Sequence, residues 1–419
     1  MYKENKQTEK FRLIRVLWLM YVLFPFYLRG IVVYQNIIFY GVSILFTVYF
    51  FYKLFSARIE RGYISRYFLY LLLFLALTIF SALIPFFKGT GDYSYTILLL
   101  TCWGRIFVLT GTVILSNSVI RYINLLIDAI NSYVICSIVL LIPRLHSFYM
   151  SILDSSTLVS SRAEEFYSQD YYTRFGLLGF SGFGCTLMCA AAVLLCCFMI
   201  VNKIGKEESI SKYVWRMTIS LVGTAMYGRV GLFASVLLIV ITLVYLAIKY
   251  KKFAILSGSI FSAVLIVILF VANASYLQQI SSIRWMFEGF FNYLDYGTFT
   301  TKSTEALGNM YFWPGAKTFF WGDGYYNVAG RYYMGTDVGF LRPLLFGGIY
   351  FELLYYATIL PLLSVINKNF TKRNGSFLLF IIIIFLVFFE FKGEVLISFS
   401  YIVYTIVCAI LLSKRINIK

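Results

Sequence analysis

Long apolar runs constrain this chain more than any other feature, because most of them could cross a lipid bilayer as a helix. A transmembrane helix needs about 20 apolar residues. Only 13% of the residues are charged, roughly half the share that covers the surface of a soluble fold. We therefore expect an all-α polytopic membrane protein with about twelve transmembrane helices. They lie near residues 13–29, 33–55, 67–87, 95–116, 119–143, 175–201, 214–228, 230–248, 253–272, 338–363, 377–392 and 395–412.

Lysine and arginine are unevenly distributed among the segments that join these runs. One set of segments, which includes both termini, holds 23 of the 36 basic residues and 6 of the 19 acidic ones, and so carries the whole net charge of +17. Cytoplasmic segments of membrane proteins retain Lys and Arg. The distribution predicts that both termini are cytoplasmic, and it explains the basic composition without a nucleic-acid partner.

Two segments expected on the outer side are long, at about 144–173 and 273–337. The second lies between the ninth and tenth expected helices and contains 18 aromatic residues, whereas disordered segments are poor in aromatics. We expect it to form short helices on the outer membrane surface. Because no internal repeat is visible, the prediction is a single transmembrane domain over residues 1–419.

Motifs of metal- and nucleotide-dependent enzymes are absent from the sequence. It has one histidine, His146, and no HExxH, GxxxxGK[ST], GxSxG or paired Asp-x-Asp pattern. All seven cysteines lie in apolar runs, where cysteine acts as a small hydrophobic residue. We therefore expect neither a metal site nor a cofactor.

Five arginines lie within apolar runs or near their expected outer ends, where an ionisable group is costly and faces a wet cavity or a partner. They are Arg105, Arg174, Arg229, Arg331 and Arg342. Guanidinium groups stay charged when desolvated and bind phosphate oxygens in pairs. If these groups converge, they would suit a lipid diphosphate. The alternative is that each arginine pairs with an acid and holds the helices together.

The acids that could form such pairs are Asp337, Glu352, Glu390 and Glu394. Asp337 is also a candidate general base, which would take the proton of an attacking sugar hydroxyl. Its alternative role is that of a counter-ion. Trp321 and Tyr325 in the outer segment are candidates for stacking on sugar rings, although interfacial aromatic belts also use Trp and Tyr.

Three stretches carry a family resemblance. The first is 173–184, T-R-F-G-L-L-G-F-S-G-F-G, and the second is 226–232, M-Y-G-R-V-G-L. The third and strongest is 320–349, with G-D-G at 322–324, Asp337, and G-G at 347–348. Together they resemble the Wzy-type polysaccharide polymerase and O-antigen ligase superfamily. Asp337 stands where the ligases have a histidine, which favours a polymerase.

The resemblance implies a GT-C-like glycosyltransferase at the outer face of the bacterial cytoplasmic (inner) membrane. It would polymerise undecaprenyl-diphosphate-linked oligosaccharide repeat units into O-antigen, capsule or exopolysaccharide, with a chain-length regulator protein as a further partner. In this interpretation the catalytic residues are Arg174, Arg229 and Asp337, and diphosphate or glycan is bound by Arg105, Arg331, Arg342, Trp321 and Tyr325. The alternatives are a lipid-linked oligosaccharide flippase or transporter, and an O-antigen ligase.

Overall fold

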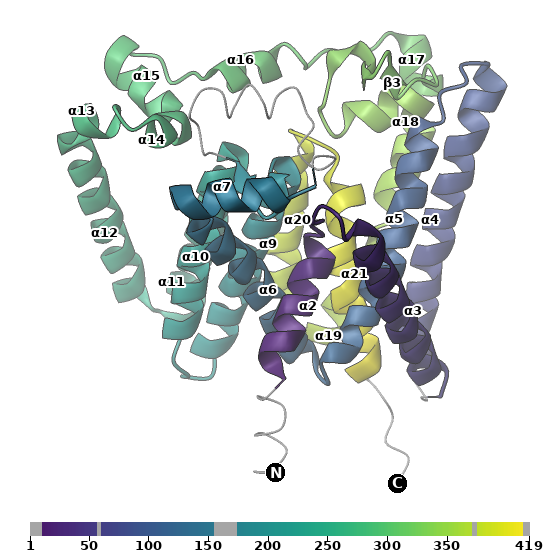
Figure 1. Ribbon diagram of the computed structural model, residues 1–419, viewed down its shortest axis with the longest axis horizontal. Coiled ribbons are helices and arrows are strands. Elements are labelled where there is room, and N and C mark those ends of the chain that lie inside the picture. Colours follow the sequence, from purple (N-terminus) through teal and green to yellow (C-terminus); the bar gives the residue numbers. More distant parts are fainter. Residues whose placement is uncertain (1–10, 57–59, 155–173, 371–374, 414–419) are drawn as a thin grey trace. The chain divides into compact units, whose positions relative to one another are not determined.

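A computed structural model describes residues 11–56, 60–154, 174–370 and 375–413 (Figure 1). Within these ranges, nine helices are long and apolar enough to cross a membrane. The chain is therefore a polytopic α-helical membrane protein, as the sequence predicts. These nine helices are Val32–Ser56, Arg61–Lys88, Ser94–Leu115, Val119–Val139, Phe183–Ile204, Arg229–Tyr250, Phe253–Ala272, Leu341–Phe370 and Val395–Ser413.

The other three expected runs form shorter helices, so the described residues supply fewer full-length spans than the twelve expected. Helices α2 (Arg12–Leu23), α10 (Ser211–Tyr227) and α20 (Gly375–Glu390) have 12, 17 and 16 residues. At 1.5 Å per residue, α10 is about 25 Å long. Pro25 explains the early end of α2, because the residue before a proline disfavours the helical conformation.

The start of the expected helix 175–201 is wrong, because a β-hairpin occupies it. Strand β1 (Phe175–Gly176) pairs antiparallel with β2 (Gly179–Phe180), and helix α9 (Phe183–Ile204) begins only afterwards. Gly179 has a φ of 80°, a left-handed conformation that glycine adopts at little cost in a tight turn. Glycine also weakens a helix interior, so the glycine-rich start of this run turns instead.

Internal contacts group the chain into two compact units, each described here by itself. The first unit comprises Met1–Asn36 and Leu125–Glu305, and the second comprises Ile37–Asn124 and Ala306–Lys419. Besides α2, α9, α10 and the hairpin, the first unit contains α6 from Leu125 onward, α7, and α11 to α15. Their bounds are α6 Val119–Val139, α7 Pro143–Ile152, α11 Arg229–Tyr250, α12 Phe253–Ala272, α13 Ala274–Leu277, α14 Ser281–Met286 and α15 Glu288–Tyr296.

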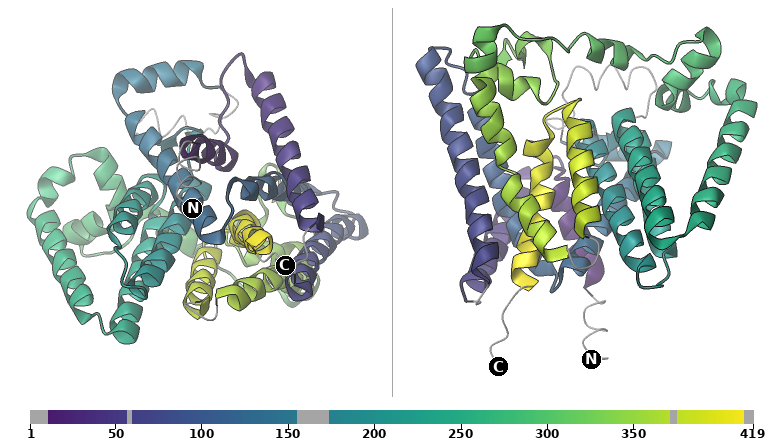
Figure 2. Two further views of the ribbon diagram at one scale, coloured as in Figure 1. Left: turned by 90° about the horizontal axis from the view of Figure 1, so that it is seen from below. Right: turned by 180° about the vertical axis from the view of Figure 1, so that it is seen from behind.

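Helix α9 is the centre of the first unit and packs against α10 and α11 (Figures 1 and 2). Small residues allow this close packing, as is common between membrane helices. A Cβ atom at Gly223 of α10 would lie 2.5 Å from Val134 of α6 and 2.8 Å from Cys189 of α9. Gly223 therefore lets three helices approach one another.

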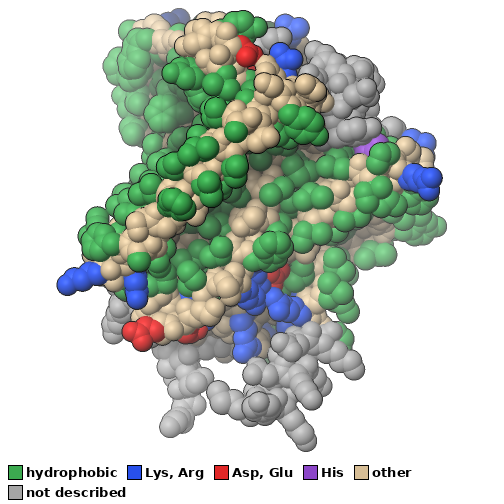
Figure 3. Space-filling model, turned by 90° about the vertical axis from the view of Figure 1, so that its left-hand side faces the viewer, with side chains coloured by type: hydrophobic (Ala, Val, Ile, Leu, Met, Phe, Trp, Pro, Cys, Tyr) green, Lys and Arg blue, Asp and Glu red, His purple; other side chains and the backbone are tan. Residues whose placement is uncertain are grey.

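Helix α12 has an exposed apolar surface along its whole length, and none of its residues is buried. Figure 3 shows hydrophobic side chains over most of this face, with Lys and Arg side chains near its edges and lower part. An apolar face of this size is suited to lipid rather than to water.

The second unit is built from long helices that pack around α4, α5 and α21. Buried hydroxyl groups connect these three helices. Tyr404 Oη lies 2.7 Å from Tyr67 Oη and 2.9 Å from Thr110 Oγ1. The helices of this unit are α3 (Val32–Ser56) from Ile37 onward, α4 Arg61–Lys88, α5 Ser94–Thr112, the 3-10 turn η1 Val113–Leu115, α17 Ala316–Trp321, the 3-10 turn η3 Tyr333–Gly335, α18 Leu341–Ala357, α19 Leu360–Phe370, α20 and α21 Val395–Ser413.

The expected outer segment 273–337 is folded into short elements. It includes α13, α14, α15 and α17, together with α16 (Lys302–Gly308), which begins in the first unit and ends in the second. A hairpin of β3 (Asn327–Val328) and β4 (Arg331–Tyr332) follows in the second unit. The placement of this segment on the outer membrane surface remains a prediction.

Candidate functional site

Arg174 and Arg229 come together in the first unit on one aromatic ring. The guanidinium carbon of Arg174 lies 5.2 Å from the ring centroid of Trp285, and that of Arg229 lies 5.0 Å from it. Both distances fall within the range of a cation–π interaction. We call Arg174, Arg229, Trp285 and the adjacent Glu288 the Trp285 site.

The backbone of Arg174 is fixed at the base of the hairpin. Its amide donates to the carbonyl of Met226 at 3.0 Å, and its carbonyl accepts from the amide of Ser181 at 2.5 Å. Arg174 has a φ of 62°, in a left-handed region that costs a residue with a side chain about 1–2 kcal/mol. Such a conformation persists where the surroundings hold it, and here the two hydrogen bonds hold the backbone from which the side chain extends.

Arg229 is the first residue of α11 and follows a break between α10 and α11 at Gly228. The hydroxyl of Thr186 in α9 donates to the carbonyl of Gly228 at 2.9 Å. A Cβ atom at Gly231 would collide with Thr186 Oγ1 and lie 3.0 Å from the Thr186 carbonyl oxygen. The glycines of the motif 226–232 thus bring α9 against the break, which places Arg229 at the start of a helix.

Glu288 is the acidic partner of Arg229. Arg229 Nη1 donates to Glu288 Oε2 at 2.5 Å, and 15% and 21% of the two side chains are exposed. Glu288 begins α15, three residues after Trp285 in α14. Carboxylates and phosphates both accept hydrogen bonds from the guanidinium fork, so a bound phosphate could compete with Glu288 for Arg229.

Helix α7, in the expected outer loop 144–173, supports the hairpin next to Arg174. The ring centroid of His146 lies 4.5 Å from that of Phe175, and the Tyr149 hydroxyl donates to the carbonyl of Leu177 at 2.6 Å. Burial lowers the pKa of His146, and this outweighs a hydrogen bond with Leu140 that raises it. The neutral imidazole therefore packs as an aromatic ring. The rest of that loop, 155–173, lies outside the described residues.

Arg342, in the second unit, lies between aromatic rings and beside a carboxylate. Its Nη1 is 3.0 Å from Glu394 Oε2, and 9% and 4% of the two side chains are exposed. Its guanidinium carbon lies 4.0 Å from the ring centroid of Tyr326 and 3.7 Å from that of Tyr332. Arg342 is therefore paired with an acid in the structure. This is the alternative to phosphate binding that the sequence leaves open.

Asp337, the candidate base, has a lysine as its neighbour. Lys392 Nζ donates to Asp337 Oδ2 at 3.2 Å. The other carboxylate oxygen, Oδ1, is buried and has no hydrogen-bond partner among the described residues. Asp337 therefore has a counter-ion and also an oxygen that a further donor could reach.

The remaining predicted site residues of the second unit do not form one cluster with a common partner. Arg105 of α5 and Arg331 of β4 are exposed. Trp321 is 64% exposed, and Tyr325 stacks on Tyr333 with ring centroids 5.4 Å apart. The five candidate arginines are thus divided between the two units. Arg174 and Arg229 belong to the first unit, and the other three belong to the second.

Glycines of the third motif bring the loop 322–327 against a break in α18. Gly348 interrupts the helix with φ 76° and ψ −176°. Gly322 has a φ of 63°, and a Cβ atom there would collide with the carbonyl oxygen of Phe346 and lie 2.6 Å from the amide nitrogens of Gly347 and Gly348. These glycines therefore allow two backbone segments to touch.

The break in α18 leaves two carbonyl groups that the loop uses. The amide of Asp323 donates to the carbonyl of Leu345 at 2.7 Å, and the amide of Gly324 donates to that of Phe346 at 2.9 Å. Irregular backbone needs such partners wherever it is buried, because unsatisfied backbone polar groups are costly away from water. The glycines of the third motif, 320–349, therefore have a structural role, because they let the loop contact the break in α18.

Asp92, in the turn between α4 and α5, holds the same loop. Its Oδ2 accepts from the amides of Tyr326 at 2.6 Å and Asn327 at 2.8 Å, and its Oδ1 accepts from the Ser94 hydroxyl. Burial disfavours the charged carboxylate, but the hydrogen bonds from Ser94, Asn327 and Tyr326 outweigh it and lower the pKa of Asp92.

Replacing Asp92 with asparagine is expected to lower the free energy of unfolding by about 1 kcal/mol near neutral pH, since the carboxylate is partly screened by solvent. Because the folded-state pKa is depressed, this stabilisation is fully present above the unfolded-state value of 3.8. It is lost as the pH falls through the folded-state pKa. Thermal unfolding from neutral to acidic pH measures both effects, and a stability difference that stays constant across this range would contradict the assignment.

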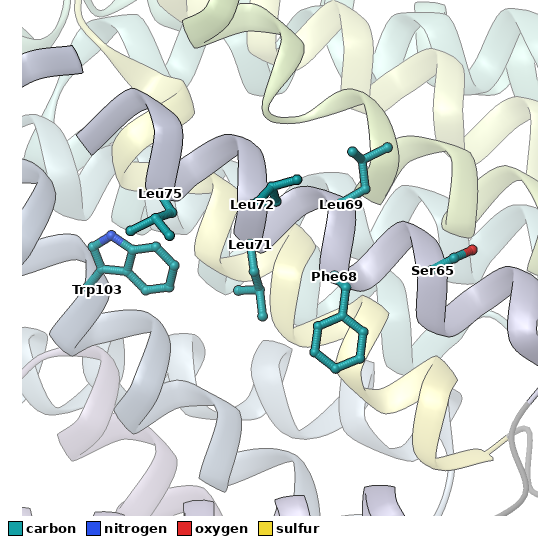
Figure 4. A pocket seen from close by; sticks show the side chains of 7 residues that line it. All are labelled: Ser65, Phe68, Leu69, Leu71, Leu72, Leu75 and Trp103. Atoms are coloured by element: carbon teal, nitrogen blue, oxygen red, sulfur yellow. The ribbon is translucent and has the colours of Figure 1, made fainter. Parts of the chain in front are cut away.

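The described residues contain no group of three or more His, Cys, Asp or Glu side chains placed to hold a metal ion. They do contain an apolar groove of about 520 Å³ in the second unit (Figure 4). Its walls come from α4 and from Trp103 of α5. The lining residues are Ser65, Phe68, Leu69, Leu71, Leu72, Leu75 and Trp103. Such a groove suits a lipid chain and offers little for catalysis.

The fold and the Trp285 site define a polytopic α-helical membrane protein with two arginines stacked on one tryptophan. No protein-family model, curated protein or solved structure matches the chain. The functional interpretation therefore depends on the chemistry of the site and on the sequence motifs.

Proposed function

We propose that this protein is a membrane glycosyltransferase that joins lipid-diphosphate-linked oligosaccharide repeat units into a polysaccharide. The observation that carries the proposal is the pair of guanidinium groups, Arg174 and Arg229, on the ring of Trp285. Two arginines held by separate backbone segments present several N–H donors in set directions, which suits the oxygens of a diphosphate. The resemblance to Wzy-type polymerases supports the same interpretation.

The reaction places negative charge where these arginines can act. The hydroxyl oxygen of the acceptor sugar attacks the anomeric carbon of the donor, and the bond from that carbon to the diphosphate oxygen breaks. The leaving diphosphate keeps the electron pair, and the acceptor hydroxyl passes its proton to a general base. Preorganised donors stabilise such developing charge in the transition state, and we assign this role to Arg174 and Arg229.

Glu288 and Trp285 position Arg229 before the substrate binds. The 2.5 Å hydrogen bond to Glu288 and the cation–π contact hold the guanidinium in one orientation. On binding, a phosphate oxygen would replace the carboxylate oxygen on the same edge of the group. Glu288 is in this proposal a positioning residue.

In the second unit, we propose that Asp337 orients or deprotonates the acceptor hydroxyl through its Oδ1 atom, which has no hydrogen-bond partner among the described residues. The buried pair of Arg342 and Glu394 fits a structural role better than a diphosphate-binding one. Glycan or diphosphate binding by Arg105, Arg331, Trp321 and Tyr325 remains part of the proposal.

The cellular setting follows from the charge distribution and the resemblance. The excess of Lys and Arg in one set of segments supports cytoplasmic termini. We propose the bacterial cytoplasmic (inner) membrane, with the active site on its outer side. The substrates would be undecaprenyl-diphosphate-linked glycans, and a chain-length regulator would be the protein partner.

The proposal is tested with the purified full-length protein in liposomes. Lipid-linked repeat units extracted from the producing strain serve as both donor and acceptor, and the products are resolved by gel electrophoresis. The expected result is a ladder of lengthening glycans without an added nucleotide. If the repeat units stay single while a known polymerase of matching specificity lengthens them, the proposal is wrong.

A flippase or transporter for the same lipid is the main alternative, because an arginine pair would bind the diphosphate in transport as well. The liposome assay separates the two functions. A flippase exposes labelled lipid on the opposite leaflet without lengthening the glycan. An O-antigen ligase would transfer the glycan once to a different lipid acceptor and would give no ladder from repeat units alone.

A further inference from the structure

The first unit has a second charged hollow, located near the other end of α10 from the Trp285 site. Arg216 lies in the second turn of α10, and Arg229 follows the end of that helix. Twelve residues of helix span about 18 Å, so the two arginines are well separated. The hollow has a volume of about 430 Å³ and is lined by Arg12, Leu13, Val16, Asp128, Asn131, Ser132, Ile135, Arg216 and Ile219.

One carboxylate connects two guanidinium groups in this hollow. Asp128 Oδ1 lies 2.5 Å from Arg216 Nη2, and Asp128 Oδ2 accepts from Arg12 Nη2 at 2.6 Å. Arg216 is buried, but 45% of the Arg12 side chain is exposed. The lining thus holds two arginines against a single acid, and Arg12 has further N–H donors that can reach a ligand.

Buried polar side chains join α6 to α10 beside the hollow. Asn131 Nδ2 donates to the backbone carbonyl of Arg216 at 3.0 Å, and the Ser220 hydroxyl donates to Asn131 Oδ1 at 2.6 Å. These bonds fix the position of Arg216 relative to Asp128, one turn before Asn131 in α6.

The pKa of Lys212 is affected by the charged side chains of the hollow. Burial, Arg216 and Arg12 lower the pKa of Lys212, although Asp128 acts in the opposite direction. The neighbouring positive charges therefore have a larger combined effect on Lys212 than Asp128 has. This agrees with the lining of the hollow, in which two guanidinium groups face one carboxylate.

Apart from Ser132, the remaining lining side chains of the hollow are apolar, and two of them are exposed. Leu13 is 68% exposed and Ile135 is 46% exposed, while Val16 and Ile219 complete the lining. A soluble anion would gain nothing from such walls. An anionic phospholipid would place its phosphate on the arginines and an acyl chain along the apolar side chains.

We propose that the hollow formed by Arg12, Asp128, Asn131 and Arg216 binds the headgroup of an anionic phospholipid. The proposal is independent of the glycosyltransferase assignment, because it concerns a different part of the first unit. In the orientation that the charge distribution predicts, the bound lipid lies in the cytoplasmic leaflet. Basic pockets between helices on that side recognise anionic headgroups.

The test uses the full-length protein in a neutral detergent and a fluorescent phosphatidylglycerol. Unlabelled phosphatidylglycerol, phosphatidylcholine with the same acyl chains and inorganic phosphate compete in separate titrations. We expect phosphatidylglycerol to displace the probe at a concentration at least about fivefold below that of phosphatidylcholine, the difference given by one charge contact. Inorganic phosphate is expected to compete weakly. Equal displacement by the two lipids, or strong displacement by phosphate, would overturn the proposal.

Arg12→Gln and Arg15→Gln form a matched pair, because both remove one positive charge from α2 and only Arg12 lines the hollow. Arg12→Gln should weaken phosphatidylglycerol binding about fivefold, whereas Arg15→Gln should leave it close to that of the native protein. Ser132→Leu narrows the hollow without a change of charge and should weaken binding as well. Equal losses in the two arginine variants, or no loss in Ser132→Leu, would show that the binding is non-specific.

Discussion

Replacing Arg229 with alanine is expected to slow glycan elongation by about 100- to 1,000-fold, the usual effect of losing one donor that stabilises transition-state charge. The substitution also leaves Glu288, which is 21% exposed, without its arginine. Because that carboxylate still reaches solvent, the protein should remain folded and inserted. The rate is measured from the growth of the product ladder with the protein in liposomes.

Two further substitutions separate a catalytic Arg229 from a structural one. Arg229→Lys keeps the charge but loses the planar fork that binds two oxygens at once, so it should restore only a small part of the rate. Glu288→Gln removes the counter-charge. It should preserve more activity than Arg229→Ala does if the arginine acts on the diphosphate. Equal losses of activity and thermal stability in Glu288→Gln and Arg229→Ala would instead identify a structural ion pair.

Arg284 provides the matched control, because it is an exposed arginine in α14 beside Trp285. Arg284→Ala removes the same charge from the same region without touching the pair on the Trp285 ring. It should retain nearly the full rate of elongation. If Arg284→Ala were as slow as Arg229→Ala, general electrostatic attraction of the substrate would explain the effect, and the specific role of Arg229 would be wrong.

The positions of the long helices could be predicted from the sequence, because an apolar run of about 20 residues has few stable forms other than a helix in a membrane. Hydropathy does not distinguish a helix from a short hairpin in a run that is apolar throughout. The segment 175–182 is such a case, and only its glycines indicate the turn. Similarly, α18 reads as one apolar run, and its break at Gly348 depends on the contact with Gly322.

The sequence predicts the meeting of Arg174 and Arg229 only in general terms, as a convergence of arginines. The particular arrangement depends on Trp285 and Glu288, which lie 56 and 59 residues after Arg229 in the chain. Nothing local marks Glu288 as a partner, since it is one of several acids in a polar and aromatic segment. For Arg342 the resemblance implies diphosphate or glycan binding. Its aromatic neighbours Tyr326 and Tyr332 come from a loop whose fold periodicity does not predict.

Gly322→Ala is expected to be the most destabilising single substitution in the loop 322–327, lowering the free energy of unfolding by about 3 kcal/mol or more. Part of the cost, about 1–2 kcal/mol, comes from placing a side chain in the left-handed conformation. The rest comes from steric overlap of the new Cβ with the backbone at Phe346 and Gly347, which cannot move as a flexible side chain would. Thermal unfolding in detergent measures the loss.

Gly330→Ala isolates the conformational part of this cost. Gly330 also has a left-handed φ, of 75°, but a Cβ atom there would meet nothing within 4 Å. Its substitution should therefore cost only about 1–2 kcal/mol. The difference between the two variants measures the contact between the loop and the break in α18. If the two variants were equally stable, the close approach of these backbone segments would be wrong, and with it the structural explanation for the glycines of the third motif.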